Sequence, residues 1–320
     1  MTVHTTTGIL VVGGANMDLK ARSARPVLAG TSNPGEMHLS PGGVGRNIAE
    51  NAARLGARVA LVSTVGSDGL GTEVLEATAA AGVDVSAVAR TAETTGTYTA
   101  LLDADGELVA AVAAMAATEE LDPGYAATEV SRAPAGTLVV ADGNLPPAVL
   151  DAVIGAAHAA DLRLVIEPVS VPKSLRLAPV LRGPIFLVTP NRDELAALTG
   201  VDAATFDGPD GDAAVVSAAE KLRAGGVEWV WIRLGAEGSL LVGPEGSVTL
   251  PPYRVEVVDV TGAGDAMLGA FCSALAGGAS VVEAARFGQA AAVVTIASTQ
   301  TVVSNLDNAR VREVLDAADH

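Results

Sequence analysis

Cysteine and aromatic residues are almost absent from this chain of 320 residues. Cys272 is the only cysteine, so a disulfide within the chain is excluded and a reduced compartment, the cytoplasm, is expected. Since Cys272 falls on a predicted buried helix, we expect a packed thiol rather than a nucleophile. Aromatic residues make up only 3% of the chain, whereas hydrophobic residues make up 49%. The core must therefore be built from small aliphatic side chains, in one large α/β domain or two modest ones.

Basic residues are also scarce. The chain has 20 Lys and Arg against 37 Asp and Glu, which gives a net charge of −17. Nucleic acids and anionic membranes favour basic patches, so neither is an expected partner. No apolar run reaches the roughly 18 residues that span a bilayer. Residues 1–7 lack the basic start and the apolar run of a signal peptide.

Short apolar runs alternate with alanine-rich stretches along the chain. The runs that are β-branched and bounded by Gly, Pro or Asp predict strands at Gly8–Val12, Val59–Val65, Thr137–Ala141, Leu162–Ile166, Ile185–Val188 and Trp229–Leu234. The stretches between them predict helices at Gly45–Leu55, Gly71–Ala81, Pro147–Ala160, Arg192–Thr199 and Ala213–Ala224. This alternation predicts an α/β fold with a mainly parallel sheet covered on both faces. Ligands of such sheets bind beyond the carboxyl ends of the strands.

Two segments interrupt the alternation, at residues 19–40 and 94–114. The second reads as two strands around the turn Asp103–Gly106, which is a typical hairpin sequence. We expect both segments to form a small β sheet, inserted in a single domain over residues 1–320. Such a sheet serves as a lid over the ligand or as a dimer contact. Because exposed ribbon edges invite pairing, the ribbon at 97–110 predicts a homodimer.

The most informative stretch is Asp259–Asp265, with the sequence Asp-Val-Thr-Gly-Ala-Gly-Asp. A β-prone run, Tyr253–Val258, precedes it and a small-residue helical run, Ala266–Leu275, follows, which predicts a strand, a glycine turn and a helix. The first N–H groups of such a helix form an anion site. Asp265 adds a carboxylate there, as expected for phosphoryl transfer with a base for the attacking hydroxyl. A capped turn is the simpler alternative.

The glycines of this stretch match no other nucleotide-binding motif. Gly262 and Gly264 are followed by Met267 where a dinucleotide-binding fingerprint needs its third glycine. The pattern G-x-x-x-x-G-K-[ST] occurs nowhere in the chain, so a Walker-type P-loop is absent.

Polar residues follow the first predicted strand and open the first predicted helix. Asp18, two residues after Asn16, stands where a strand end presents a carboxylate to sugar hydroxyls, or where a turn simply needs an Asp. Gly42 and Gly43 allow a ligand close to the backbone. Asn47, one turn into the helix, both donates and accepts, which suits a diol.

Two later strand ends carry similar signals. Asn191 and Glu194 have the spacing of a capping box, and their oxygens also suit Mg²⁺ held through water. Arg233 precedes a glycine pair, Gly235 and Gly238, which permits a close approach to a nucleotide or forms a hairpin.

Together these motifs resemble the ribokinase-like carbohydrate kinases, the PfkB family. The resemblance rests on Gly42-Gly43-x-x-x-Asn47, Asn191-x-x-Glu194 and Asp259-x-Thr261-Gly262-Ala263-Gly264-Asp265, in that order and spacing. It covers nearly the whole chain. The family implies a doubly wound α/β domain with a β lid, ATP as phosphoryl donor, Mg²⁺, and in many relatives a monovalent cation such as K⁺ near 297–301.

The resemblance also implies a role for each matched residue. Asp265 is the base, and Gly262, Ala263 and Gly264 form the anion hole. The implied ATP contacts are Asn191, Arg233, Gly235, Gly238, Thr261, Gly262 and Gly264, with Glu194 and Asn191 serving Mg²⁺. The implied substrate contacts are Asn16, Asp18, Gly42, Gly43, Asn47 and Thr97. Arg233 stands where many relatives have Thr, so its phosphate contact departs from the family pattern.

Within the family the chain resembles the members that phosphorylate the 5′-hydroxyl of pseudouridine. The segments that carry this resemblance are 15–18, 31–35, 42–51 and 167–174, and Val44 and Arg46 differ from the ribokinase pattern. Asn144, Thr97, Tyr98 and Lys173 are candidates for base recognition by their positions. Ribokinase, or another nucleoside or sugar kinase, is the second interpretation. A sugar-binding regulator on the same fold is the alternative outside enzymes, although such a protein is expected to lose Asp265 or the glycine turn.

Overall fold

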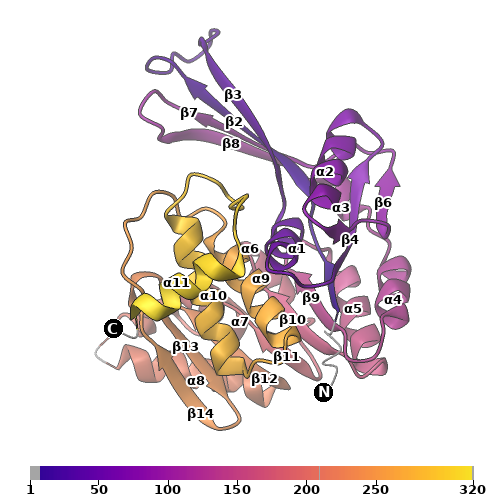
Figure 1. Cartoon of the computed structure of the whole chain (residues 1–320), viewed down its shortest axis with the longest axis vertical. Helices are drawn as coiled ribbons and strands as arrows, with labels where there is room; N and C mark the ends of the chain where they lie inside the picture. Colours follow the sequence, from indigo (N-terminus) through magenta and orange to yellow (C-terminus); the bar gives the residue numbers. More distant parts are fainter. Residues whose placement is uncertain (1–7, 209, 319–320) are drawn as a thin grey trace.

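A computed structural model describes residues 8–208 and 210–318 of the chain. The segment 1–7, which bears on the signal-peptide prediction, lies outside the described residues. In the described part, the central sheet has ten strands in the order β14-β13-β12-β11-β10-β9-β1-β4-β5, with β6 also paired to β4 (Figure 1). Their bounds are β1 Ile9–Val12, β4 Val59–Gly66, β5 Val83–Asp84, β6 Val88–Thr91, β9 Leu138–Asp142, β10 Arg163–Glu167, β11 Ile185–Val188, β12 Val227–Arg233, β13 Ser239–Gly243 and β14 Gly246–Leu250.

The strands from β4 through β1, β9, β10 and β11 to β12 all run parallel, and only β13 and β14 join antiparallel. All six predicted strands are therefore confirmed. The helices that connect and cover them are α1 Val44–Arg54, α2 Gly69–Ala80, α3 Ala116–Glu119, α4 Pro123–Arg132, α5 Pro147–Ala159, α6 Val171–Leu177, α7 Arg192–Thr199, α8 Gly211–Ala224, α9 Ala263–Ala276, α10 Val281–Ile296 and α11 Asn308–Ala318. Two single 3₁₀ turns lie at Ala203–Phe206 and Gly235–Glu237.

The core has two layers, one on each face of the sheet. Successive residues of a strand point to opposite faces, and β1 shows this directly. Leu10 and Val12 join a buried cluster with α4, α5, α7 and α8, whereas Ile9 and Val11 join a second cluster with α1, α9 and α10. The predicted α/β fold with helices on both faces is thus confirmed.

A separate sheet of four strands projects from one end of this body, in the order β3-β2-β7-β8 (Figure 1). Its strands are β2 Asn16–Ser23, β3 Gly35–Gly42, β7 Thr97–Leu102 and β8 Leu108–Ala114. The two segments that interrupt the alternation supply these strands. The turn at Asp103–Gly106 closes the β7–β8 hairpin, where Gly106 has a φ of 94°.

The predicted strand at Tyr253–Val258 is wrong. The segment is an exposed, extended loop, and its end is tied to α10 because the N–H groups of Val258 and Asp259 donate to the carbonyl oxygen of Ile296. Pro251 and Pro252 come directly after β14 and have no N–H to donate to a sheet. The predicted glycine turn and helix do follow, with α9 beginning at Ala263.

Candidate active site

A cavity of about 1250 Å³ lies between the second sheet and the carboxyl ends of β1, β9 and β10. Predicted substrate or phosphate residues that line it are Asn16, Asp18, Gly43, Asn47, Thr261, Gly262 and Asp265. Tyr98, Asn144 and Lys173, the candidates for base recognition, line it as well. Residues more than 200 positions apart in sequence therefore meet in one space.

Thr97 does not line this cavity, although it is half-buried near it. The cavity-lining residues of β7 are Tyr98, Ala100 and Leu102. Because side chains alternate along a strand, Thr97 belongs to the opposite face of the second sheet. On β2 the lining residues are Asn16, Asp18, Lys20 and Arg22, and the last two were not predicted from the sequence.

The glycine turn at Gly262 begins α9 and forms the floor of the cavity. Gly262 has a φ of 80°, and a Cβ at this position would overlap the carbonyl oxygen of Thr301. Only glycine satisfies both conditions. The Ala263 N–H donates to the Val260 carbonyl oxygen at 3.2 Å, and the other N–H groups of the first turn of α9 have no partner within the helix, so the turn suits an anion.

Asp265 lies in this first turn of α9. The Nδ2 atom of Asn47, on α1, donates to its Oδ2 at 2.8 Å. Burial, together with the negative charges of Glu167 and Asp142, raises the pKa of Asp265 to about 7, although the Asn47 hydrogen bond and the charge of Arg233 oppose the shift. A carboxylate with a pKa near neutrality is suited to accept a proton from a hydroxyl at physiological pH.

Asp18 occupies the opposite wall of the cavity, on β2. Asn16 donates from Nδ2 to its Oδ1 at 2.7 Å. A Cβ at Gly42, on the neighbouring strand β3, would lie 2.5 Å from Asp18 Oδ2, so the carboxylate fits only against glycine. Burial raises the pKa of Asp18, and Asn16, Lys20 and Arg46 oppose that shift. The adjacent Gly43 has a φ of 98° and packs on the Gly14 backbone, which brings α1 close to β1.

A second polar group surrounds Arg233, at the end of β12. Its Nη2 donates to Glu167 Oε1 at 2.8 Å and to Glu194 Oε2 at 2.9 Å. A Cβ at Gly264 would lie 2.6 Å from Arg233 Nη1, so this guanidinium reaches the first turn of α9. Arg233 therefore connects the two buried carboxylates to the anion site.

The capping-box prediction for Asn191 and Glu194 is confirmed. Asn191 Oδ1 accepts from the Glu194 N–H at 2.8 Å, and Glu194 Oε2 accepts from the Asn191 N–H at 2.8 Å. Burial raises the pKa of Glu194, and the positive charge of Arg233 opposes the shift. Within the described ranges, no group of three or more His, Cys, Asp or Glu side chains is arranged to hold a metal by itself.

Gly235 and Gly238 lie in the tight turn between β12 and β13, where the Leu234 N–H donates to the Gly238 carbonyl at 2.9 Å. Gly238, with a φ of 91°, packs against the backbone of Pro251 and Pro252. Pro252 borders the second cavity described next.

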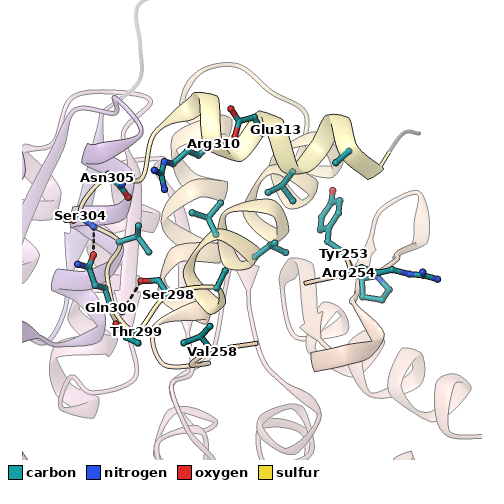
Figure 2. Close-up of a pocket in the computed structure, with 17 residues that line it drawn as sticks. Tyr253, Arg254, Val258, Ser298, Thr299, Gln300, Ser304, Asn305, Arg310 and Glu313 are labelled. Atoms are coloured by element: carbon teal, nitrogen blue, oxygen red, sulfur yellow. Dashed lines mark hydrogen bonds between the residues drawn. The ribbon is translucent and has the colours of Figure 1, made fainter. Parts of the chain in front are cut away.

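A second cavity, of about 1360 Å³, opens beside α10 and α11, and its lining side chains are shown in Figure 2. Its polar lining includes Tyr253, Arg254, Ser298, Gln300, Asn305, Arg310 and Glu313. Gln300 accepts from the Ser304 N–H at 2.9 Å and donates its own N–H to Ser298 Oγ at 3.1 Å, which orders this wall (Figure 2). Val258 and Thr299 line both cavities, so the two spaces adjoin at the glycine turn. No local pattern in the sequence indicates this cavity, because Tyr253 and Arg254 meet the residues of α10 and α11 only in the packed fold.

The chain is similar to known kinases over nearly its whole length. The sequence pattern of the pfkB family carbohydrate kinases matches residues 6–308. Pseudouridine kinase of Escherichia coli is 30% identical over 313 residues and 97% of each chain is covered, and a ribokinase of Haemophilus influenzae is 30% identical over 255 residues with 80% of each covered. Phosphofructokinase-2 from Escherichia coli, in a crystal structure with potassium, has the same fold, with a TM-score of 0.83 at 23% identity over 98% of this chain and all of that one.

None of the described helices is long and apolar enough to cross a membrane.

Proposed function

The chain belongs to the pfkB family of carbohydrate kinases, and from this premise we propose that it transfers the γ-phosphoryl group of ATP to the 5′-hydroxyl of pseudouridine. That it is an ATP-dependent sugar or nucleoside kinase follows from the family. The observation that carries the finer proposal is the cavity in which Asp18, Asn47 and Asp265 meet the glycine turn.

The two adjoining cavities suggest where each substrate binds. The nucleoside occupies the cavity under the second sheet, where Asp18 and Asn47 hold the ribose hydroxyls. ATP occupies the cavity beside α10 and α11, with its phosphates directed to the turn at Gly262. The shared wall at Val258 and Thr299 is then where the γ-phosphoryl group meets the 5′-hydroxyl.

In this arrangement Asp265 takes the proton of the 5′-hydroxyl as its oxygen attacks the γ-phosphorus atom. The bond between that phosphorus and the β–γ bridging oxygen breaks, and ADP leaves. Charge develops on the equatorial oxygens of the phosphoryl group during the transfer. The N–H groups at Gly262, Ala263 and Gly264 stabilise it, and so does the guanidinium of Arg233.

Asn191 and Glu194 fit a site for Mg²⁺ held through water, as Mg²⁺ keeps several waters and uses one or two carboxylates together with substrate phosphates. Arg233 and Asn191 contact only the Oε2 atom of Glu194, so Oε1 would be the oxygen that holds such a water. Mg²⁺, when bound, neutralises phosphate charge in the transfer. We place Thr261, Gly235 and Gly238 along the phosphates and a monovalent cation, K⁺, at the loop 297–301.

Pseudouridine is preferred to ribose as the acceptor for two reasons. The likeness to the Escherichia coli pseudouridine kinase extends over 97% of both chains, and the cavity continues past the ribose contacts to Tyr98, Asn144 and Lys173, where a base would lie. Ribose remains the second candidate, because the Haemophilus influenzae ribokinase is equally identical over a shorter stretch.

The second sheet acts as a lid on this single domain, and its edge strand β8 pairs with a second copy in a homodimer. All seven residues of β8 are exposed, and Leu108, Val109 and Val112 are apolar. An exposed apolar edge of this kind is a template for pairing. We propose a cytoplasmic location, which the use of ATP and the single cysteine, Cys272, both favour.

A substrate panel tests the proposal. ADP release is measured with pseudouridine, uridine, adenosine, ribose and fructose 6-phosphate at equal concentrations, with Mg²⁺ and with or without K⁺. The phosphorylated position is then identified from phosphorus–proton couplings. We expect pseudouridine to give the highest kcat/KM and a 5′-phosphate product. A higher kcat/KM with ribose, or a product phosphorylated elsewhere, would overturn the proposed substrate.

A further inference from the structure

We propose that Arg46 is a positioning residue for phosphoryl transfer, because its guanidinium sets which end of the Asn47 amide faces Asp265. The inference rests on the proposed function, in which Asp265 is the base. Arg46 itself does not line the substrate cavity. It lies on the first turn of α1 and is only 4% exposed.

The hydrogen bonds around the Asn47 amide allow one orientation. Arg46 Nη1 lies 2.6 Å from Asn47 Oδ1, and Asn47 Nδ2 lies 2.8 Å from Asp265 Oδ2. A guanidinium can only donate hydrogen bonds and an ionised carboxylate can only accept them. The amide oxygen must therefore face Arg46, and the amide NH₂ must face Asp265. Without Arg46, no donor would hold the amide oxygen on the far side of Asn47. Rotation of the amide would then turn this oxygen toward the Asp265 carboxylate and replace a hydrogen bond by a repulsion.

Arg46 also fixes the backbone on the other side of the site. The same Nη1 atom donates to the carbonyl oxygen of Pro41 at 2.8 Å, near the end of β3. Pro41 precedes Gly42, whose bare Cα leaves the space for Asp18. One buried side chain thus holds both the helix that carries Asn47 and the strand that packs on Asp18.

The charge of Arg46 is compensated on the side away from the substrate. Arg46 and Arg54 both form ion pairs with Glu50, one turn apart on α1, and Glu50 is 4% exposed. Burial lowers the pKa of Arg46 to about 10, so the guanidinium stays protonated at neutral pH. Its positive charge in turn opposes the rise in the pKa of Asp18.

A purely structural role for Arg46, as a partner of Glu50, is the competing explanation. Arg54 is the matched control, because it binds the same Glu50 carboxylate at 2.6 Å. The other hydrogen bond of Arg54 is to the carbonyl oxygen of Ser304, away from Asn47. If Arg46 only neutralises Glu50, then R46M and R54M should affect catalysis alike.

The pH dependence of kcat separates the two explanations. Asp265 is faced by Glu167 from β10, Asp142 from β9, Arg233 from β12 and the Asn47 amide from α1. Among these contacts only the Asn47 amide is held by Arg46, and the positive charge of Arg46 also acts on Asp265 directly. Losing one hydrogen bond to a charged group raises a carboxylate pKa by about one unit.

The experiment measures kcat and KM between pH 5.5 and 9 for the wild type, R46M, R46K, R54M and R46M/E50Q (these pH limits bracket the expected midpoint by about 1.5–2 units). The double variant leaves no buried Glu50 charge unpaired, so it remains informative if R46M folds poorly. We expect R46M and the double variant to shift the acidic midpoint up by about one pH unit and thereby to lower kcat at pH 7 by about 5-fold, since the midpoint moves from about 7 to about 8. The acidic midpoint and kcat of R46K should lie between those of R46M and those of the wild type. R54M should keep the wild-type midpoint.

A wild-type midpoint and kcat in folded R46M/E50Q would overturn the role of Arg46. An equal shift in R54M would also overturn it, in favour of the structural explanation. The proposed function fails in a different way, through absence of wild-type turnover with pseudouridine or persistence of the acidic limb in Asp265→Asn. If another acceptor proves to be the substrate, the same variants are compared with that acceptor.

Discussion

Substitution of Gly262, in the glycine turn at the start of α9, should affect both stability and catalysis, and a control substitution can separate the two effects. At Gly262 an alanine would carry two penalties. The φ of 80° is unfavourable for any residue with a Cβ, at about 1 kcal/mol, and the Cβ would also overlap the Thr301 carbonyl oxygen. Because Thr301 O is a backbone atom, the overlap can be relieved only by moving the start of α9 or the Thr301 loop, by roughly 1 Å.

Gly278, just after the other end of α9, is the matched control. Its φ is 95°, but nothing lies within 4 Å of a Cβ placed there. Gly278→Ala should therefore lose about 1 kcal/mol of stability and keep its kcat/KM. Gly262→Ala should lose more stability and also about 10²-fold in kcat/KM, since a displacement of about 1 Å in a reacting group has that effect.

The assay combines thermal unfolding with coupled ADP release for the wild type and both variants. A shift of about 2–4 °C in Tm corresponds to the backbone penalty alone. Full activity in a folded Gly262→Ala variant would refute the view that this turn forms the phosphoryl site. Equal losses of activity in both variants would refute the view that the contact between a Cβ at position 262 and the Thr301 carbonyl oxygen displaces the site.

Three further predictions concern the other parts of the site. Asp18→Ala should weaken nucleoside binding in calorimetry while ATP binding is kept, because Asp18 lies in the nucleoside cavity alone; unchanged nucleoside affinity would refute its role. Since the folded-state pKa of Asp265 is raised from 3.8 to about 7, its contribution to stability is fully present below pH 3.8 and lost as the pH rises through 7, whereas kcat should rise over that upper limb. Asp265→Asn should therefore unfold at a higher temperature than the wild type at pH 8, and a lower Tm would contradict the raised pKa of this carboxyl group. Val112→Lys, on the exposed β8 edge, should convert a dimer into a monomer in light scattering, and a monomeric wild type would exclude the proposed pairing.

The parallel sheet could be predicted from sequence because its strands are short, β-branched and bounded by breakers. The helix α9 and its glycine turn were predictable for a similar local reason. Tyr253–Val258 has the same β-prone composition, but strand formation also needs a partner with free N–H and C=O groups. Pro251 and Pro252 have no N–H group to donate, so the chain cannot continue pairing in the sheet where it leaves β14.

The site was predicted as far as its residues carry local signals. Asp18, Asn47 and Asp265 stand next to glycines or strand ends, and the structure brings all three together. Thr97 and Tyr98 are neighbours on β7 and were both predicted to contact the substrate. Successive residues of a strand point to opposite faces of the sheet, so only Tyr98 lines the cavity. The ion pair between Arg233 and Glu167 joins residues 66 positions apart, so no local pattern indicates it.

The second cavity and the Arg46 contacts share this long-range character. Arg46 could be recognised in the sequence only as a departure from the ribokinase pattern. Its function as a donor to both Pro41 and Asn47 depends on how β3 and α1 meet at Gly43. Contacts of this kind depend on the packed fold rather than on any spacing in the sequence.

The proposed function makes Asp265 the base of an ATP-dependent pseudouridine kinase. Its most direct test is the rate of pseudouridine 5′-phosphate formation by the wild type and by Asp265→Asn, with nucleoside binding to both proteins measured by calorimetry. We predict that Asp265→Asn stays folded, binds pseudouridine and loses about 10²–10⁴-fold in kcat. Near-normal kcat in that variant would show that Asp265 is not the base.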